Sequence, residues 1–357
     1  VWSVGWNGAG ALGQGITTQY TTVIGQVKEQ VEGTDGQKTE KPITDAKHVI
    51  AAGDTTYITR QKDENGKAQG MYATGYNNYG MLFTQDVTAR TYATPAETDK
   101  DILTATITKN YEYQTGAIVD QDGMVYTVGY NANGELGLED NTNRTKPTQT
   151  NMKNVIDIAA GANHTMVLKK DGTVWETGYN NKGQLGDGTS TASNAFHKVK
   201  LNGDGDYLEN IVQIVSEDYT SHALTADGSV YSWGYNRYGQ FGINKGTGED
   251  ANPYPVKMQK VSNIIQMSTG EEHISMLDAD GSVWSVGSNG NGQFGTNSAE
   301  GTSLPTQMLD TDGKSILYGV KEIASGRDHT VLIKEDNTVW SVGWNGAGAL
   351  GQGITTQ

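Results

Sequence analysis

The stretch IDIAAGANHTMVLKKDGTVWETGYNNKGQLG, residues 156–186, contains the features that decide the fold. Its apolar residues are spaced near a period of 2 rather than 3.6, which favours strands over helices. Asp171-Gly172 separates two such runs, and an Asp-Gly pair in that place predicts a β-hairpin with a type I′ turn. The stretch therefore predicts a short apolar strand, a glycine turn, a second strand, a hairpin, and an aromatic strand that ends in a glycine turn.

The second half of this stretch recurs along the whole chain as V-(W/Y)-x-x-G-(Y/W)-N-x-x-G-x-(L/F)-G. Seven copies are present, at intervals of 49 to 70 residues, and the copy that begins at Met71 is the weakest. We expect the aromatic residue in the second position to pack in the core or between blades, and the glycine in the fifth to form a turn. The six stronger copies place these residues at Trp2 and Gly5, Tyr126 and Gly129, Trp175 and Gly178, Tyr231 and Gly234, Trp284 and Gly287, and Trp340 and Gly343.

The first half of the stretch recurs less regularly and carries a histidine. His164, His273 and His329 occupy the same repeat position, whereas the copy over residues 211–228 has lost the glycine and the histidine. Imidazole is a common metal ligand, but equivalent positions on different repeats are expected to lie far apart. We therefore expect a structural role, such as a hydrogen bond that fixes a strand turn.

A unit of about 50 residues with several short strands and periodic glycine and aromatic residues is typical of a propeller blade. The sequence predicts an all-β fold of propeller-type blades with short antiparallel strands, in six full repeats plus an overlapping half-repeat. A closed ring and an open superhelical array both fit this pattern. The half-repeat covers residues 1–19, and the repeats cover 20–88, 89–142, 143–191, 192–247, 248–300 and 301–357.

The repeats resemble those of the regulator of chromosome condensation family, in a bacterial-looking form. The resemblance rests on Gly161–Thr165, Asp171–Trp175 and Gly178–Gly186, and on the recurrence of these motifs over nearly the whole chain. It implies a β-propeller of four-stranded blades that binds a protein partner through its loops. The chain departs from the family in having six periods where seven are usual, and Phe83 where the family has a glycine.

The two ends of the chain are identical, because residues 1–19 and 339–357 both read VWSVGWNGAGALGQGITTQ. The internal copies differ at most variable positions, so chance does not explain this identity. A tandem array with a 338-residue unit, a sequence overlapping itself in an assembly, and an engineered duplication are three explanations. Each end then presents an incomplete blade whose strand edge invites another strand, which predicts self-association or pairing with neighbouring units.

Composition excludes several classes of function. The formal net charge of −15 argues against a nucleic-acid partner, which requires a basic surface. The absence of cysteine excludes disulfides, thiolate catalysis and cysteine-based zinc sites. No apolar run is long enough to span a bilayer.

No catalytic, cofactor-binding or metal-binding motif can be assembled from the sequence, so we expect a protein that is not an enzyme and needs no cofactor. Two acidic loops, Asn202–Asp206 and Asp310–Gly313, offer oxygen ligands for a loosely held calcium ion. Neither matches an EF-hand, and solvated turns are the simpler interpretation.

Two functional hypotheses remain. The first is a non-enzymatic structural or adhesive array, outside the cell or at its surface, which the duplicated ends favour. The alternative is a single propeller that binds one protein partner through its loop face, comparable to a propeller that inhibits β-lactamases. Loop aromatics such as Tyr79, Tyr238 and Tyr254 would then contribute to the binding face.

Overall fold

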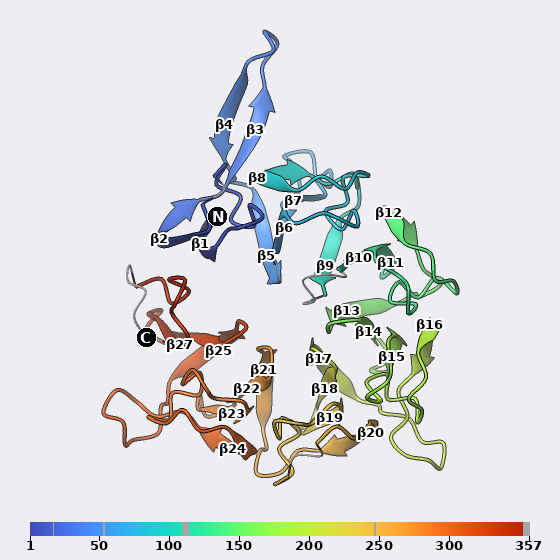
Figure 1. Cartoon of the computed structure of the whole chain (residues 1–357), viewed down its shortest axis with the longest axis vertical. Coiled ribbons are helices and arrows are strands. Elements are labelled where there is room, and N and C mark those ends of the chain that lie inside the picture. Colours follow the sequence, from blue (N-terminus) through green and yellow to red (C-terminus); the bar gives the residue numbers. More distant parts are fainter. Residues whose placement is uncertain (17, 53, 109–113, 246–247, 353–357) are drawn as a thin grey trace.

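The computed structural model describes all residues except 17, 53, 109–113, 246–247 and 353–357. The described residues form 27 strands and no α-helix, so the all-β prediction is confirmed. Six antiparallel blades stand around a central space, and a two-stranded half-blade lies between the last blade and the first (Figure 1). The prediction of six repeats plus a half-repeat is confirmed as well.

Four blades consist of four consecutive strands, the first of which is innermost. The second blade contains β9 (Ile102–Ile107), β10 (Thr115–Asp120), β11 (Val125–Gly129) and β12 (Arg144–Gln149), and the third contains β13 (Val155–Ala160), β14 (His164–Lys169), β15 (Val174–Gly178) and β16 (Ser193–Lys198). The fourth blade contains β17 (Ile211–Glu217), β18 (Thr220–Thr225), β19 (Val230–Gly234) and β20 (Asn252–Lys257). The fifth contains β21 (Ile264–Thr269), β22 (His273–Asp278), β23 (Val283–Gly287) and β24 (Thr302–Gln307).

The first and last blades differ from these four. The first blade contains β5 (Ala46–Ala52), β6 (Thr55–Arg60), β7 (Met71–Gly75) and β8 (Arg90–Pro95), and the hairpin of β3 (Lys28–Glu32) and β4 (Lys38–Pro42) extends from β8. The last blade has three strands, β25 (Val320–Ser325), β26 (His329–Lys334) and β27 (Val339–Gly343). The half-blade pairs β1 (Trp2–Trp6) with β2 (Tyr20–Gln26). Each repeat delimited from the sequence thus spans the fourth strand of one blade and the first three of the next.

The second and third strands of the blades are joined by the predicted hairpins, but with a different turn. In β14–β15 the Gly172 N–H donates to Lys169 O at 2.9 Å, and only Gly172 of the Asp-Gly pair has a positive φ, of 76°. A type I′ turn needs positive φ at both residues, so the type I′ prediction is wrong. The aspartate instead accepts hydrogen bonds within the turn, as Asp171 Oδ1 does from the Thr173 N–H at 3.1 Å.

The core is divided among the interfaces between neighbouring blades. One cluster joins Met166 and Val174 of the third blade to Ile211, Ile214 and Trp233 of the fourth. Similar clusters lie between the other consecutive blades from the first to the last. Alternate residues of each strand therefore face the adjacent blade, which explains the period of 2 in the sequence.

The longest repeat interval contains an insertion. Residues 21–33 fit an amphipathic helix or a strand and loop equally well by pattern alone. The structure forms β2 and β3 there, and the β3–β4 hairpin meets β8 through a parallel bridge between Glu29 and Ala93. This hairpin projects away from the ring, as Figure 1 shows.

Candidate partner-binding face

Two kinds of loop meet at one end of the propeller, which we call the loop face. They are the turns between first and second strands and the longer loops between third and fourth strands. Backbone hydrogen bonds tie them together in each blade, for example from Tyr179 N to Asn163 O at 2.8 Å and from Ser288 N to Glu272 O at 2.8 Å. The opposite side, the hairpin end, consists of the Asp-Gly hairpins and the connections between consecutive blades.

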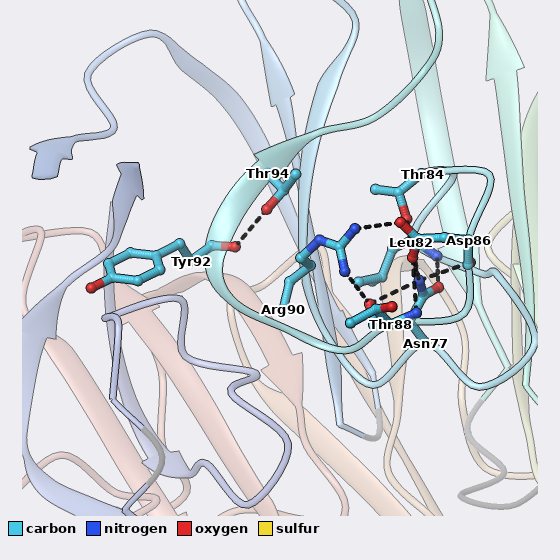
Figure 2. A network of polar contacts seen from close by, with 8 residues as sticks. All are labelled: Asn77, Leu82, Thr84, Asp86, Thr88, Arg90, Tyr92 and Thr94. Carbon is cyan, nitrogen blue, oxygen red and sulfur yellow. Dashed lines mark hydrogen bonds and ion pairs between the residues drawn. The ribbon is translucent and has the colours of Figure 1, made fainter. Parts of the chain in front are cut away.

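A buried asparagine holds each long loop in shape. In the first blade, Asn77 Oδ1 accepts from the Leu82 N–H at 2.9 Å, and Asn77 Nδ2 donates to Asp86 O and Thr88 O at 3.0 and 3.1 Å (Figure 2). Arg90 closes the same loop through a 2.5 Å ion pair with Asp86. The sequence contains this asparagine in every copy of the motif, and that recurrence is the signal that marks the position.

The same arrangement recurs around the loop face, so the loops form a fixed platform. Asn180 Oδ1 accepts from the Leu185 N–H at 2.9 Å, and its Nδ2 donates to Thr191 O at 3.0 Å. These interactions satisfy backbone groups that would otherwise be buried without partners. The equivalent buried residues are Asn7, Asn77, Asn131, Asn180, Asn236, Asn289 and Asn345.

Aromatic side chains of this platform stand at the surface in pairs. Tyr79 meets Tyr130 of the next blade edge to face, with ring centroids 5.4 Å apart. Tyr179 and Tyr219, which also belong to neighbouring blades, lie 5.8 Å apart. The predicted loop aromatics Tyr79 and Tyr238 therefore lie on the loop face. Tyr254 instead lies in the outer strand β20, with its hydroxyl next to Gly188.

One group of aromatic and charged side chains on this face joins three blades, and we call it the Tyr238 cluster. It contains Lys182 from the third blade, Tyr235, Arg237, Tyr238 and Glu249 from the fourth, and Glu272 from the fifth. Lys182 Nζ lies 2.8 Å from the Glu249 carboxylate and 5.0 Å from the centre of the Tyr235 ring. Arg237 lies 3.4 Å from Glu249 and 5.7 Å from the Tyr238 ring centre.

Hydrogen bonds and burial shift the pKa values of two groups in this cluster. Hydrogen bonds from Lys182 and Tyr235 lower the pKa of the Glu249 carboxyl, so this group is ionised. A hydrogen bond to Glu272, assisted by burial, raises the pKa of the Tyr238 hydroxyl to about 12. The cluster therefore offers the neutral phenols of Tyr235 and Tyr238 and the ionised carboxylate of Glu249 beside the side chains of Lys182 and Arg237 at neutral pH.

The inner rim of the loop face is rich in carboxylates. Glu271 and Glu272 follow β21, and Arg327 and Asp328 follow β25. The Arg327 guanidinium contacts the carboxylates of Glu271 and Asp328, the latter at 3.4 Å. Burial raises the pKa of Glu271, and the charge of Arg327 opposes that shift.

The recurring histidines lie at the start of the second strands, where His164 and His273 are fully buried and His329 of the last blade is half-buried. His164 is fully buried, and its Nε2 lies 2.8 Å from Ser216 Oγ and 3.0 Å from Ser221 Oγ of the next blade. The glycine three residues earlier has a steric reason, because a Cβ at Gly161 would overlap the His164 imidazole. The same overlap would occur between Gly270 and His273 and between Gly326 and His329.

Ser221, His164 and Glu176 together resemble a catalytic triad in composition, since Ser221 Oγ also donates to Glu176 Oε2 at 3.2 Å. All three side chains have no exposed surface, so a substrate cannot reach them. Burial raises the pKa of Glu176 well above its usual value and lowers that of His164 to about 3. His164 is therefore uncharged at neutral pH, and burial disfavours the charged form of Glu176, which suits a packed interface between blades.

The other predicted repeat positions lie in the third strands. The aromatic residues of the complete blades are half-buried, and a lysine cation lies over two of them, since Lys100 Nζ and Lys169 Nζ each lie 5.4 Å from the ring centres of Tyr126 and Trp175. Trp2 and Trp340, at the two ends of the chain, are 61% and 44% exposed and do not pack in the core. Each of the glycines has a positive φ between 94° and 116°. In Gly178 the missing Cβ leaves room for Asn163 O of the adjoining turn, so the glycine allows the two loops to meet.

The two acidic loops proposed for calcium form hydrogen-bonded turns. Asn202 Nδ2 donates to Asp206 Oδ2 at 2.9 Å, and Asp312 Oδ1 accepts from the Lys314 and Ser315 N–H groups. Among the described residues, no group of three His, Asp or Glu side chains is placed to hold a metal ion. A calcium site in these loops stays a prediction.

Comparison with known proteins identifies relatives that share this architecture. Over 235 residues the chain is 34% identical to the probable E3 ubiquitin-protein ligase HERC4 of Mus musculus, which covers 66% of this chain and 22% of the relative. It is 26% identical over 322 residues to the ultraviolet-B receptor UVR8 of Arabidopsis thaliana, covering 88% and 67% of the two chains. The match to human HERC4 spans 13% of that protein, so most of each ligase lies outside the similarity.

Solved structures share the fold at low sequence identity. Human WBSCR16 superposes with a TM-score of 0.77 at 16% identity, over 99% of this chain and 90% of that one. Prp20p of Saccharomyces cerevisiae, studied for its binding to Gsp1p and histones, gives a TM-score of 0.76 at 20% identity, over 98% and 82%. The described part of the chain contains no helix able to cross a membrane.

A family model described as the RCC1-like domain matches residues 111–357, which is more than half of the chain. This match agrees with the repeated motifs and with the six blades. The chain therefore belongs to the RCC1-like domain family of β-propellers.

Proposed function

We propose that this chain is a protein-binding propeller that holds one protein partner against its loop face. The family supports this proposal, because its relatives include a light receptor, ligases and a protein that binds Gsp1p and histones. The ligase activity of the HERC relatives is not transferred, since the similarity covers between 13% and 22% of their length. A single partner-binding propeller thus fits better than a structural fibre.

The Tyr238 cluster is the observation that carries the proposal. Tyrosine supplies contact area at low entropic cost, and arginine beside it is typical of residues that dominate binding energy. The Tyr238 side chain is 36% exposed, although a core of buried strands lies beneath it. The ion pairs around it lie at the surface and add little to stability, so their arrangement over three blades is better explained by recognition.

The carboxylates of the inner rim suggest the charge of the partner. Glu271, Glu272 and Asp328 outnumber Arg327 there, and the whole chain has a net charge of −15. A partner surface with exposed lysine or arginine would be attracted to this rim, whereas an acidic one would be repelled. We therefore expect a partner that presents basic residues beside an apolar or aromatic contact for the tyrosines.

The hairpin end offers a matched control for the test. Tyr207 is 43% exposed there, Lys198 Nζ lies 4.4 Å from its ring centre, and Lys198 pairs with Glu209 at 2.9 Å. This trio repeats the chemistry of Tyr238, Arg237 and Glu249 at the opposite end. The double variant Lys198→Glu/Tyr207→Ala is therefore the control for Arg237→Glu/Tyr238→Ala.

The experiment captures partners from an extract of the source cells on the immobilised wild-type chain and on both double variants. We expect one protein, bound in 1:1 ratio by light scattering, to be retained by the wild type and by the control but lost from Arg237→Glu/Tyr238→Ala. Equal retention by both variants, or loss from the control alone, would overturn the loop-face assignment. Matching unfolding curves ensure that the comparison concerns folded proteins.

A repeating array of 338-residue units, at the cell surface or outside the cell, is the second proposal. Only the identity of residues 1–19 and 339–357 favours it. Light scattering of the native protein tests it, since an array predicts a particle several times heavier than 38.3 kDa. A particle of about that mass would exclude the array.

A further inference from the structure

A cavity of about 770 Å³ opens at the hairpin end, away from the loop face that carries the proposed function. Its walls are the connection between the third and fourth blades, residues 199–210, and the hairpin between β18 and β19. Leu201, Tyr207 and Leu208 line it from the connection, and Tyr231 of β19 lines it from the blade. A cavity of this size with apolar and aromatic walls is typical of a small-molecule site.

In three other blades a cation covers the aromatic residue of the third strand. This cation belongs to the last residue of the second strand, whose side chain lies over the ring. The pairs are Arg60 with Tyr72, Lys169 with Trp175 and Lys334 with Trp340, at 4.4, 5.4 and 5.7 Å from the ring centre. In the second blade Lys100 takes this place over Tyr126. The blades therefore use this ring repeatedly to hold a positive charge.

The fourth blade lacks this cation. Thr225 is the last residue of β18, and its hydroxyl donates to Ser229 O at 2.9 Å within the hairpin. Among the described residues no lysine or arginine lies over the Tyr231 ring, which lines the cavity instead. Lys257, opposite Tyr231 on β20, is exposed and does not line the cavity. The ring surface that holds a charge of the chain in other blades is thus available to a charge from outside.

Carboxylates give the cavity a preference for cations. Asp206, Glu209 and Asp227 line it, and in the described part of the chain no lysine or arginine does so. Hydrogen bonds from Thr225 and Ser229 lower the pKa of Asp227, so its carboxylate is ionised at neutral pH.

One wall of the cavity shows how an ammonium group is held there. Lys198 Nζ lies 4.4 Å from the Tyr207 ring centre and 2.9 Å from the Glu209 carboxylate. Tyr207 and Glu209 both line the cavity, whereas Lys198 approaches them from outside its lining. Tyr231 and Asp227 offer the same combination of a ring and a carboxylate on the blade side, without a cation of the chain.

We propose that this cavity binds a free aliphatic polyamine. One ammonium group would lie over the Tyr231 ring beside Asp227, in place of the cation that the other blades supply. Asp206 would receive a second ammonium group, and Leu201 and Leu208 would contact the aliphatic stem. A lysine side chain of another protein carries only one ammonium group, so a lining with three carboxylates favours a polyamine. The site is separate from the loop face and independent of the function proposed for it.

Titration of the folded chain with spermidine, followed by nuclear magnetic resonance of the tyrosine rings, tests the site. Tyr231→Leu removes the ring without changing the charge, and Thr225→Lys restores the cation found at this position in the third blade. Two matched controls lie in the second blade. Tyr126→Leu removes a ring that is already covered, and Gln121→Lys adds the same charge at an exposed position. Urea unfolding curves show whether each variant is folded.

We expect spermidine to bind the wild type and both controls in 1:1 ratio, and to bind Tyr231→Leu and Thr225→Lys at least about tenfold more weakly. A capped peptide with a single lysine should bind the wild type more weakly than spermidine does. Equal affinity of Tyr231→Leu and the wild type would overturn the proposal, because attraction to the net charge alone would then explain binding. Binding that does not saturate would overturn it as well. A lysine peptide that binds as tightly as spermidine would exclude a polyamine as the ligand.

Discussion

The two ends of this propeller use polar groups in different ways. At the hairpin end each aspartate bonds within its own turn, as Asp336 does with the Thr338 N–H at 2.9 Å. On the loop face the contacts cross between blades, as the ion pair of Lys182 with Glu249 does. The aspartates at the hairpin end fix single turns, and backbone bonds such as that from Ile211 N to Gly172 O at 3.1 Å join these turns to the next blade. On the loop face, side-chain contacts between blades hold the exposed groups in place, which lowers the entropic cost of binding a partner.

The largest effect on stability is expected from the loop asparagines, each of which holds one long loop of the loop face within its own blade. Asn180→Ala leaves the buried Leu185 N–H without its partner and frees the carbonyls of the exposed Thr189 and Thr191. We expect the free energy of unfolding to fall by about 2 kcal/mol, because a buried donor left unsatisfied costs about 1–3 kcal/mol. Urea unfolding measures the change.

The matched variant at the hairpin end is Thr173→Ala, which removes the bonds of Thr173 Oγ1 to Asp171 and Trp175. Thr173 is itself buried, but Asp171 is exposed and Trp175 is half-buried, so water can reach both of its partners. We expect a loss of about 1 kcal/mol or less. Equal losses in Thr173→Ala and Asn180→Ala would contradict the distinction between a local turn and a loop frame.

The next largest effect is a pH dependence of the stability, which arises from His164 at the interface between two blades. Burial lowers the pKa of His164 to about 3, whereas an unfolded histidine titrates near 6.5. The unfolded chain therefore binds the proton first as the pH falls, and stability decreases below pH 6.5. The contribution lost between pH 7 and pH 5.5 is about 1.3 kcal/mol.

The variant His164→Asn isolates this contribution, because all other titrating groups are unchanged. We expect its unfolding free energy to vary less with pH than that of the wild type over the same interval. The hairpin aspartates add nothing here, since hydrogen bonds lower the pKa of Asp171 and Asp336 and their effect lies below the unfolded value near 3.9. Identical slopes for variant and wild type would show that His164 is charged or exposed.

The smallest effect on stability is expected for the exposed ion pair of the Tyr238 cluster. Arg237→Ala removes a side chain that is 57% exposed, from a pair with Glu249. Such pairs contribute about 0.5 kcal/mol or less, so the unfolding midpoint in urea should stay almost unchanged. A loss above about 2 kcal/mol, far beyond the value for an exposed pair, would mean that this cluster serves stability rather than binding.

The sequence was sufficient to predict the repeated part of the fold. The strands, the hairpins at Asp171-Gly172 and its equivalents, and the six blades with a half-blade follow from short-range patterns that recur. The turn type could not be predicted in the same way. The Asp-Gly pair fits two hairpin geometries, and the one adopted depends on the number of residues between the paired strands.

The sequence predicted the candidate binding face only in part. Tyr79 and Tyr238 could be placed on loops, but their partners, Tyr130 and Glu272, belong to other blades and follow no fixed spacing. Tyr254 looked equivalent and lies elsewhere, because the loop before β20 is longer than its counterparts. The sequence shows the loop asparagine as a repeated letter. Its role depends on the backbone carbonyls nine and eleven residues further along the chain, to which its side chain donates hydrogen bonds.

The most direct test of partner binding at the loop face is amine-reactive cross-linking of the native complex, followed by peptide mapping. Two lysines lie at each end of the propeller. Lys182, which is half-buried, and Lys245, which is exposed, lie on the loop face. Lys170 and Lys260, which are both exposed, lie at the hairpin end. We predict cross-links from the partner to Lys182 and Lys245, and none to Lys170 or Lys260. Cross-links confined to Lys170 and Lys260 would contradict the assignment of the loop face as the binding surface.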